Sequence, residues 1–205
     1  MRKEYKKLIK KADVFTLELT DICNLDCNFC ANRLMTRERG MMDLELATRL
    51  IREVKDTKFC DEIVTNLMGE PLLYKDLFAL LKYAYMLNQK ICILTNGEKL
   101  DEDIATKLFK YPPSSIGISY HTHNDLSYSF KHSSLTYEQY KNRILKFIEL
   151  KFKHKVKTYI CINVLSTINN PHDKFKILDN NEDIGLFKKE WLAFAKFIKK
   201  KYKIF

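Results

Sequence analysis

The sequence has no apolar stretch long enough to span a bilayer, and it does not open with the charged and then apolar segment of a secretory signal. A membrane or secreted protein is therefore not expected, and the cytoplasm is the expected compartment. The sequence also lacks a second cysteine pair spaced to complete a zinc site beside the three cysteines of residues 23–30. Structural zinc takes four ligands, usually as two separated pairs, so this absence disfavours zinc.

The composition is that of a folded protein. Hydrophobic residues make up 46% of the 205 and aromatic residues 12%, which predicts one domain over 1–205 with a sizeable core. Lys and Arg number 36 against 26 Asp and Glu, a formal charge of +10. Basic residues cluster only near the two ends, where a helix over 1–12 and a last helix with a solvated basic face explain them, so nucleic acid is not an expected partner.

One loop concentrates the chemistry. Cys23, Cys27 and Cys30 lie within eight residues, directly after the strand-like run 14–19. In a [4Fe–4S] cluster each iron prefers a soft thiolate, so three close cysteines can hold three irons and leave the fourth open. We interpret the loop as the ligand set of such a cluster. A disulfide fits poorly because the thiols crowd one short loop and no secretory signal precedes them.

The other cysteines stand far apart in apolar surroundings, and we expect them to be small buried hydrophobic residues; they are Cys60, Cys92 and Cys161.

Strands and helices are predicted to alternate along the chain. The predicted strands are 14–19, 62–67, 91–94, 115–120 and 159–165. The predicted helices are 43–54 with Asp43 as N-cap, 77–84, 101–109, one opened by a capping box of Thr136 and Gln139, and one over 187–198. A polar loop is expected from 121 to Ser134. This α/β alternation predicts a parallel sheet with right-handed crossovers.

Polar and glycine-containing motifs lie at or just after the end of every predicted strand. In parallel α/β barrels the carboxyl ends of the strands face one side, where the loops build the active site. The candidates there are the cysteine loop, Gly69-Glu70-Pro71, Thr95-Asn96-Gly97, Ser119 with His121, and Asn163. Each also has an ordinary structural explanation as a turn or a polar strand residue. Their shared position nevertheless favours a common site.

The spacing C-x3-C-x2-C, with Phe29 before the last cysteine and Glu18-Leu19-Thr20-Asp21-Ile22 before the first, resembles the radical S-adenosylmethionine (radical SAM) enzymes. The resemblance implies a partial, TIM-like (β/α)6 barrel over 13–205, here ending as Tyr202–Phe205 begin a sixth strand. It implies two cofactors, a [4Fe–4S] cluster and SAM. In such enzymes SAM chelates the open iron, and one-electron reduction cleaves it to methionine and a 5′-deoxyadenosyl radical that takes a hydrogen atom from the substrate.

The resemblance also implies roles for individual residues. Gly69 and Glu70 match the glycine-glutamate segment that binds the amino group of SAM, and Met68 stands where many members have a second glycine but still offers a carbonyl. The remaining cofactor-binding residues implied are Phe29 beside the adenine, Pro71, Thr95 and Asn96 in the pocket, Ser119 toward the ribose, and Asn163 toward the ribose or carboxylate. The implied metal ligands are Cys23, Cys27 and Cys30.

The loop after the fourth strand carries three histidines, His121, His123 and His132. A metal site or a general acid is conceivable there, but no third ligand is visible beside the close pair His121 and His123. A substrate-facing loop and an ordinary polar loop both remain open.

The sequence indicates the substrate less clearly than it indicates the cofactors. Gly69-Glu70-Pro71-Leu72-Leu73 looks most like the SPASM group of this family, although the cysteine-rich extension of that group is absent from these residues. By analogy we expect an oxidoreductase or transferase acting on a peptide, a protein or a small molecule, with a flavodoxin or ferredoxin as electron donor. Glycyl-radical activation and cofactor biosynthesis are further options. The alternative class is a non-catalytic iron–sulfur or electron-transfer module, or an inactive truncated remnant.

Overall fold

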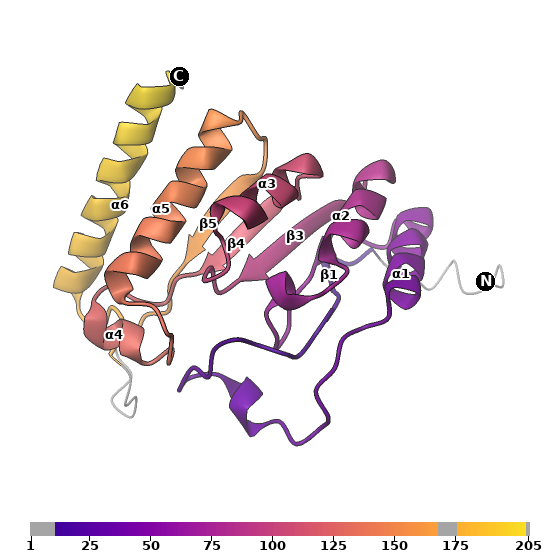
Figure 1. The fold of residues 1–205 in the computed structure, drawn as a ribbon, viewed down its shortest axis with the longest axis horizontal. Coiled ribbons are helices and arrows are strands. Elements are labelled where there is room, and N and C mark those ends of the chain that lie inside the picture. Colours follow the sequence, from indigo (N-terminus) through magenta and orange to yellow (C-terminus); the bar gives the residue numbers. More distant parts are fainter. Residues whose placement is uncertain (1–10, 168–175, 204–205) are drawn as a thin grey trace.

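Five parallel strands form one sheet at the centre of the molecule (Figure 1). The computed structural model describes residues 11–167 and 176–203. The strands pair in chain order, β1-β2-β3-β4-β5, so each neighbour is reached by a crossover. Their bounds are β1 Val14–Thr16, β2 Glu62–Val64, β3 Lys90–Thr95, β4 Ser115–Ser119 and β5 Tyr159–Asn163. This confirms the α/β class and the partial barrel expected from the sequence.

Helices connect the strands and lie along the outside of the sheet, from α1 at one end to α5 and α6 at the other (Figure 1). Their bounds are α1 Leu44–Thr57, α2 Leu77–Met86, α3 Glu102–Lys110, α4 Asp125–Ser129, α5 Tyr137–Lys153 and α6 Asn181–Tyr202, with short 3₁₀ helices η2 Ala31–Leu34 and η3 Pro71–Leu73. No helix within the described ranges is long and apolar enough to cross a membrane.

The helices begin where side chains can cap them. The Asp43 carboxylate accepts from the amides of Glu45 and Leu46, and Thr136 and Gln139 form the capping box expected from the sequence. Such caps satisfy amides that have no partner inside the helix, and each contributes about 1 kcal/mol.

The core lies between the sheet and the helices. Ile63, Ile93 and Ile116 of the strands are at most 1% exposed, as are Leu80 of α2 and Leu108 of α3. Burying a side chain of this size contributes about 1.5–3 kcal/mol. This packing holds the strands in register and brings their carboxyl ends, with the loops that follow them, to one end of the sheet.

Several expectations about the fold need correction. The stretch 121–134 is not all loop: α4 forms there because Asn124 and Ser127 make a second capping box. Tyr202 does not begin a sixth strand, since it is the last residue of α6, and Lys203 caps the helix in a left-handed conformation. The rest of that expected strand, 204–205, lies outside the described residues.

Two further expectations are partly tested. Most of the helix expected over 1–12 lies outside the described residues, and positions 11 and 12 are not helical. Cys60 and Cys92 are buried as expected, whereas Cys161 is only half-buried because it lies on β5 at the edge of the sheet.

Candidate functional site

The cysteine loop is held in place by backbone hydrogen bonds at both ends. The amide of Met42 donates to the carbonyl of Leu19 at 2.8 Å, which joins the segment before the cysteines to the segment before α1. Farther out, the amide of Asn28 donates to the carbonyl of Phe130 at 2.9 Å, which ties the loop to the segment after α4. The cysteines therefore stand on a loop fixed from two directions.

All three loop cysteines line one pocket of about 340 Å³ at the carboxyl end of the sheet. Six of the nine residues expected to bind SAM also line it: Phe29, Met68, Gly69, Glu70, Asn96 and Ser119. The pocket is thus built by loops that follow β1, β2, β3 and β4, as the placement of motifs after strands predicted. His121, Lys131 and Leu165 complete its far wall.

The thiols of the pocket are neutral in the absence of metal. Burial raises the pKa of Cys23, and it raises the pKa of Cys27 to about 12 against the opposing effect of the Lys131 charge. Both groups stay protonated near neutral pH until a metal displaces the proton. The Cys30 Sγ accepts from the amide of Asn32 at 3.4 Å and caps η2.

The donor set fits an iron–sulfur cluster. Among the described residues, no three His, Cys, Asp or Glu side chains are arranged to hold a metal ion. A cluster asks for a different arrangement, because each cysteine binds a separate iron and the thiolates need not converge on one point. Three half-buried soft thiols facing a pocket of this volume meet that requirement.

Gly69 lets the loop after β2 lie directly against the loop after β1. A Cβ at this position would lie 2.1 Å from the carbonyl oxygen of Thr20 and 2.9 Å from the Cα of Asp21. The next amide, that of Glu70, donates to the carbonyl of Ile22 at 2.9 Å. The two loops therefore share a tight backbone seam beside the cysteines.

The Glu70 carboxylate is 1% exposed and engaged by three donors. The Thr95 hydroxyl and the Asn96 amide donate to it at 2.7 Å each, and the Leu72 amide donates at 3.0 Å. Burial raises the pKa of Glu70, while these donors act in the opposite direction. The side chain thus joins the loops after β2 and β3.

Asn96 links that junction to the cysteine loop. Its Nδ2 donates to the Oδ1 of Asn24 at 3.0 Å and lies 3.8 Å from the Sγ of Cys23. Asn24 in turn donates to the buried Glu98 carboxylate at 2.8 Å, and the Glu98 amide donates back to Asn96 Oδ1 at 2.9 Å. These bonds fix the cysteine loop from behind.

His121 and Phe29 form an aromatic corner of the pocket. Their ring centroids are 5.9 Å apart and the rings are nearly perpendicular. The Leu165 amide donates to His121 Nδ1 at 3.1 Å, so the ring hydrogen of the neutral form lies on Nε2. Burial lowers the pKa of His121 to about 4, which makes it a neutral donor near pH 7.

Three residues expected at the SAM site lie outside the pocket wall. Pro71 is buried at the start of η3, Thr95 stands behind the wall against Glu70, and Asn163 ends β5 beside Ser119 of β4. The Cys161 thiol donates to Asn163 Oδ1 at 3.3 Å. Their roles toward SAM stay predictions.

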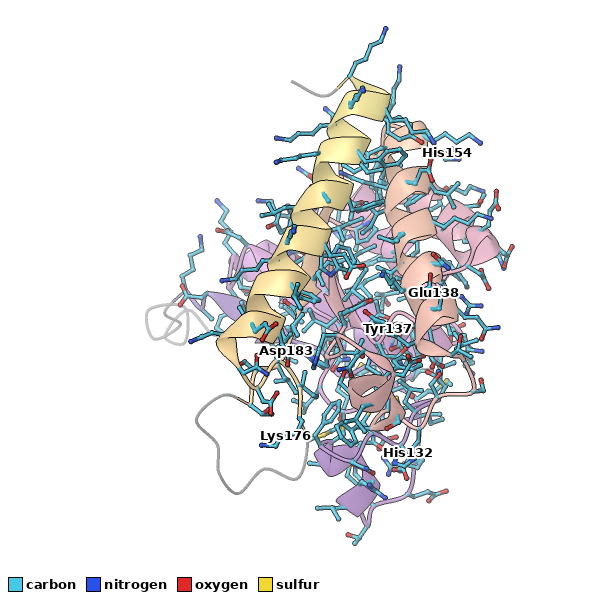
Figure 2. All side chains as sticks on the ribbon, turned by 90° about the vertical axis from the view of Figure 1, so that its left-hand side faces the viewer. His132, Tyr137, Glu138, His154, Lys176 and Asp183 are labelled. Atoms are coloured by element: carbon cyan, nitrogen blue, oxygen red, sulfur yellow. The ribbon has the colours of Figure 1, made fainter. Side chains whose placement is uncertain are left out.

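The other two histidines of this region connect segments. His123 Nε2 lies 3.4 Å from Asp183 Oδ2 at the start of α6, and His132 Nε2 lies 2.5 Å from Asn28 Oδ1 of the cysteine loop. Figure 2 shows Asp183 and His132 toward the same end of the molecule, with His154 at the other. We find no shared metal site for these histidines among the described residues.

Lys131 is a charged pocket residue that no sequence motif indicates. It is 1% exposed, follows α4, and is one of many lysines in a strongly basic chain. No periodicity or motif marks it, because its burial depends on the packing of α4 and α5 around it. Only the contacts of the folded chain show that Lys131 is buried in the pocket wall.

The chain matches a family model described as the Radical SAM superfamily over residues 17–172. It is 27% identical over 175 residues to an uncharacterised protein of Methanocaldococcus jannaschii, an alignment covering 79% of this chain and 55% of that protein. It is 33% identical over 96 residues to the S-adenosyl-L-methionine-dependent 2-deoxy-scyllo-inosamine dehydrogenase of Niallia circulans, covering 45% and 38% of the two chains. The alignments therefore span little more than half of the first relative and less than half of the second.

Solved structures share the fold. Streptococcus suis SuiB bound to its precursor peptide SuiA superposes with a TM-score of 0.61 and 19% identity, covering 98% of this chain and 39% of SuiB. BtrN in complex with AdoMet and 2-DOIA gives a TM-score of 0.58 and 22% identity, covering 75% of this chain and 58% of BtrN. At these identities the likeness concerns the fold.

Proposed function

The chain belongs to the radical SAM superfamily, and we propose that it generates a 5′-deoxyadenosyl radical from SAM to take a hydrogen atom from a substrate. Proteins of this family bind a [4Fe–4S] cluster and SAM, and the family's chemistry begins with cleavage of SAM. The observation that carries the proposal is the single pocket shared by three cysteine thiols and the Gly69-Glu70 segment.

In this proposal Cys23, Cys27 and Cys30 hold the cluster and leave one iron open to SAM. When bound, the cluster and SAM supply the electron and the radical precursor. The chain's own task is to hold both in one orientation. The bonds from Asn96 to Asn24, and from Asn24 to Glu98, keep the cysteine loop from shifting.

Gly69 and Glu70 are proposed to shape the amino-group end of the SAM site. The close approach at Gly69 brings the Met68–Glu70 backbone to the pocket wall, and Glu70 fixes the neighbouring Asn96 amide. Neutral His121 can donate from Nε2, and Phe29 offers a ring face or edge for the adenine. Ser119 at the end of β4 is proposed to lie toward the ribose.

We propose a peptide or protein as the substrate. The support is the structural likeness to SuiB, which is crystallised with a precursor peptide and covers nearly all of this chain. A small molecule is the second candidate, favoured by the match to an inosamine dehydrogenase. The same reasoning proposes an oxidoreductase or transferase, a reduced flavodoxin or ferredoxin as electron donor, and a reducing compartment such as the cytoplasm.

The test is anaerobic reconstitution with iron and sulfide, followed by dithionite and SAM. Cluster formation is measured by iron content and electron paramagnetic resonance, and 5′-deoxyadenosine by chromatography. We expect deoxyadenosine from the wild-type chain and loss of both cluster and product in Cys27→Ala. The matched control is Cys60→Ala, a cysteine outside the pocket, which should retain both.

Other outcomes would decide against the proposal. A loaded cluster without SAM cleavage would favour the non-catalytic iron–sulfur module. A cluster that survives Cys27→Ala would remove the loop from the metal site.

A further inference from the structure

Lys131 places an ammonium group inside the pocket wall. Its Nζ donates to the carbonyl of Ser119 at 2.9 Å and to the Tyr140 hydroxyl at 3.2 Å. The same nitrogen lies 4.4 Å from the centre of the Tyr140 ring, a cation–π geometry. Tyr140 is itself fully buried and donates to the carbonyl of Asn96 at 2.8 Å. These contacts hold the Lys131 ammonium in one position.

This buried charge has no carboxylate partner. In the part of the chain that the structure describes, ten ion pairs form and none includes Lys131. Glu98 is nearby, but its carboxylate accepts from Asn24, Tyr128 and Ser133. Burying an unpaired charge costs several kcal/mol. A fold that keeps Lys131 there is expected to gain an anionic partner when the pocket fills.

The cysteine loop becomes a source of negative charge beside Lys131 when its thiols bind metal. The Cys27 thiol donates to the backbone carbonyl of Lys131 at 3.8 Å, and the Lys131 side chain lines the same pocket as all three thiols. An anionic Cys27 and the Lys131 ammonium attract each other across this pocket. Iron binding would keep the three thiols in their anionic thiolate form, so the single positive charge of Lys131 would offset part of their negative charge.

We propose that the Lys131 ammonium offsets the charge of the cysteine thiolates and thereby raises the reduction potential of the cluster. The inference rests on the proposed function. Lys131 acts through the cluster and is a positioning residue. Reduction adds one negative charge to the cluster, and a fixed positive charge in a poorly solvated wall stabilises the reduced form more than the oxidised form. The lysine would therefore make the cluster easier to reduce.

The experiment compares reconstituted variants in a redox titration followed by electron paramagnetic resonance, without SAM. Lys131→Met removes the charge and keeps the length, Lys131→Gln removes the charge and keeps a donor for Ser119, and Lys131→Arg keeps the charge. The matched control is Lys151→Met on α5, whose Nζ also lies over a ring, that of Phe152 at 4.1 Å, but which lines a groove away from the cysteines. Iron content and thermal melting are recorded for each protein.

We expect a more negative midpoint potential in both neutral variants, and a value close to wild type in Lys131→Arg and in Lys151→Met. Loss of the cluster in a folded neutral variant, with loading restored by arginine, would also support the proposal. A native potential in a loaded neutral variant would overturn it. So would weaker SAM binding, measured separately on the same loaded variants, at an unchanged potential, because Lys131 would then serve the cosubstrate. Failure of the wild-type chain to load a cluster would instead reject the proposed function.

Discussion

Gly69 offers the sharpest test of how the pocket is built. In Gly69→Ala the new methyl would lie 2.1 Å from the Thr20 carbonyl oxygen, whereas ordinary van der Waals contact begins near 3.4 Å. The obstacle is backbone, which no change of rotamer can relieve. The loops after β1 and β2 would have to separate by roughly 1 Å.

That separation also breaks the seam between the loops. The Glu70 amide donates to the Ile22 carbonyl at 2.9 Å and would lose this bond. Overpacking of this kind costs about 1–3 kcal/mol, and a lost hydrogen bond adds about 0.5–1.5 kcal/mol. For a domain of this size, a loss of about 2–4 kcal/mol lowers the melting temperature by roughly 5–15 °C.

The assay is thermal melting of the protein without cofactors, followed by SAM binding to reconstituted protein. Gly185→Ala is the matched control, because a Cβ there meets nothing within 4 Å on α6. Alanine in a helix interior is favoured over glycine by about 0.5–1 kcal/mol, so the control should melt slightly higher. Equal melting temperatures for Gly69→Ala and wild type would show that the loops after β1 and β2 do not pack tightly at Gly69.

Two further predictions concern buried carboxylates. In Glu70→Gln, the donors that now meet a carboxylate would meet an amide group, so we expect the free energy of unfolding, measured by chemical denaturation, to fall by about 1–3 kcal/mol. We also expect weaker SAM binding with the cluster retained, and unchanged SAM affinity would remove Glu70 from the site. Hydrogen bonds from the Gly40 amide and Arg37 hold the pKa of Asp21 below its usual value. Its stabilising contribution is therefore present above its usual pKa and is lost as the pH falls through the lowered value. The stability advantage of wild type over Asp21→Asn should be constant from pH 7 to about pH 4 and shrink below that, and a difference independent of pH would contradict it.

Features with a local cause could be predicted from the sequence. Asp43 caps α1 and Thr136 pairs with Gln139 because a cap depends on residues three positions apart. The cysteine spacing is equally local. Placing the motifs at one end of the sheet required only the rule that parallel strands end together.

Features that depend on contacts between distant parts of the chain, or on segments too short to show a pattern, could not be predicted from the sequence. Helix α4 is five residues long, too short for a hydrophobic period to appear, so the stretch was expected to be a loop. The prediction of a sixth strand was wrong at Tyr202, because a short apolar and aromatic segment suits a strand and a helix equally. Lys131 is buried by elements that meet only in the folded protein, and its sequence neighbours give no sign of it.

Asn96 shows why the pocket behaves as one unit. Its amide donates to Glu70, its carbonyl accepts from Tyr140, and Tyr140 accepts from Lys131. One residue at the end of β3 thereby connects a buried acid and a buried base that form no ion pair with each other. Direct pairing would neutralise both charges inside the wall. Held apart by Asn96, the acid stays with the β2 loop and the base stays with the thiols, so the two ends of the pocket differ in charge.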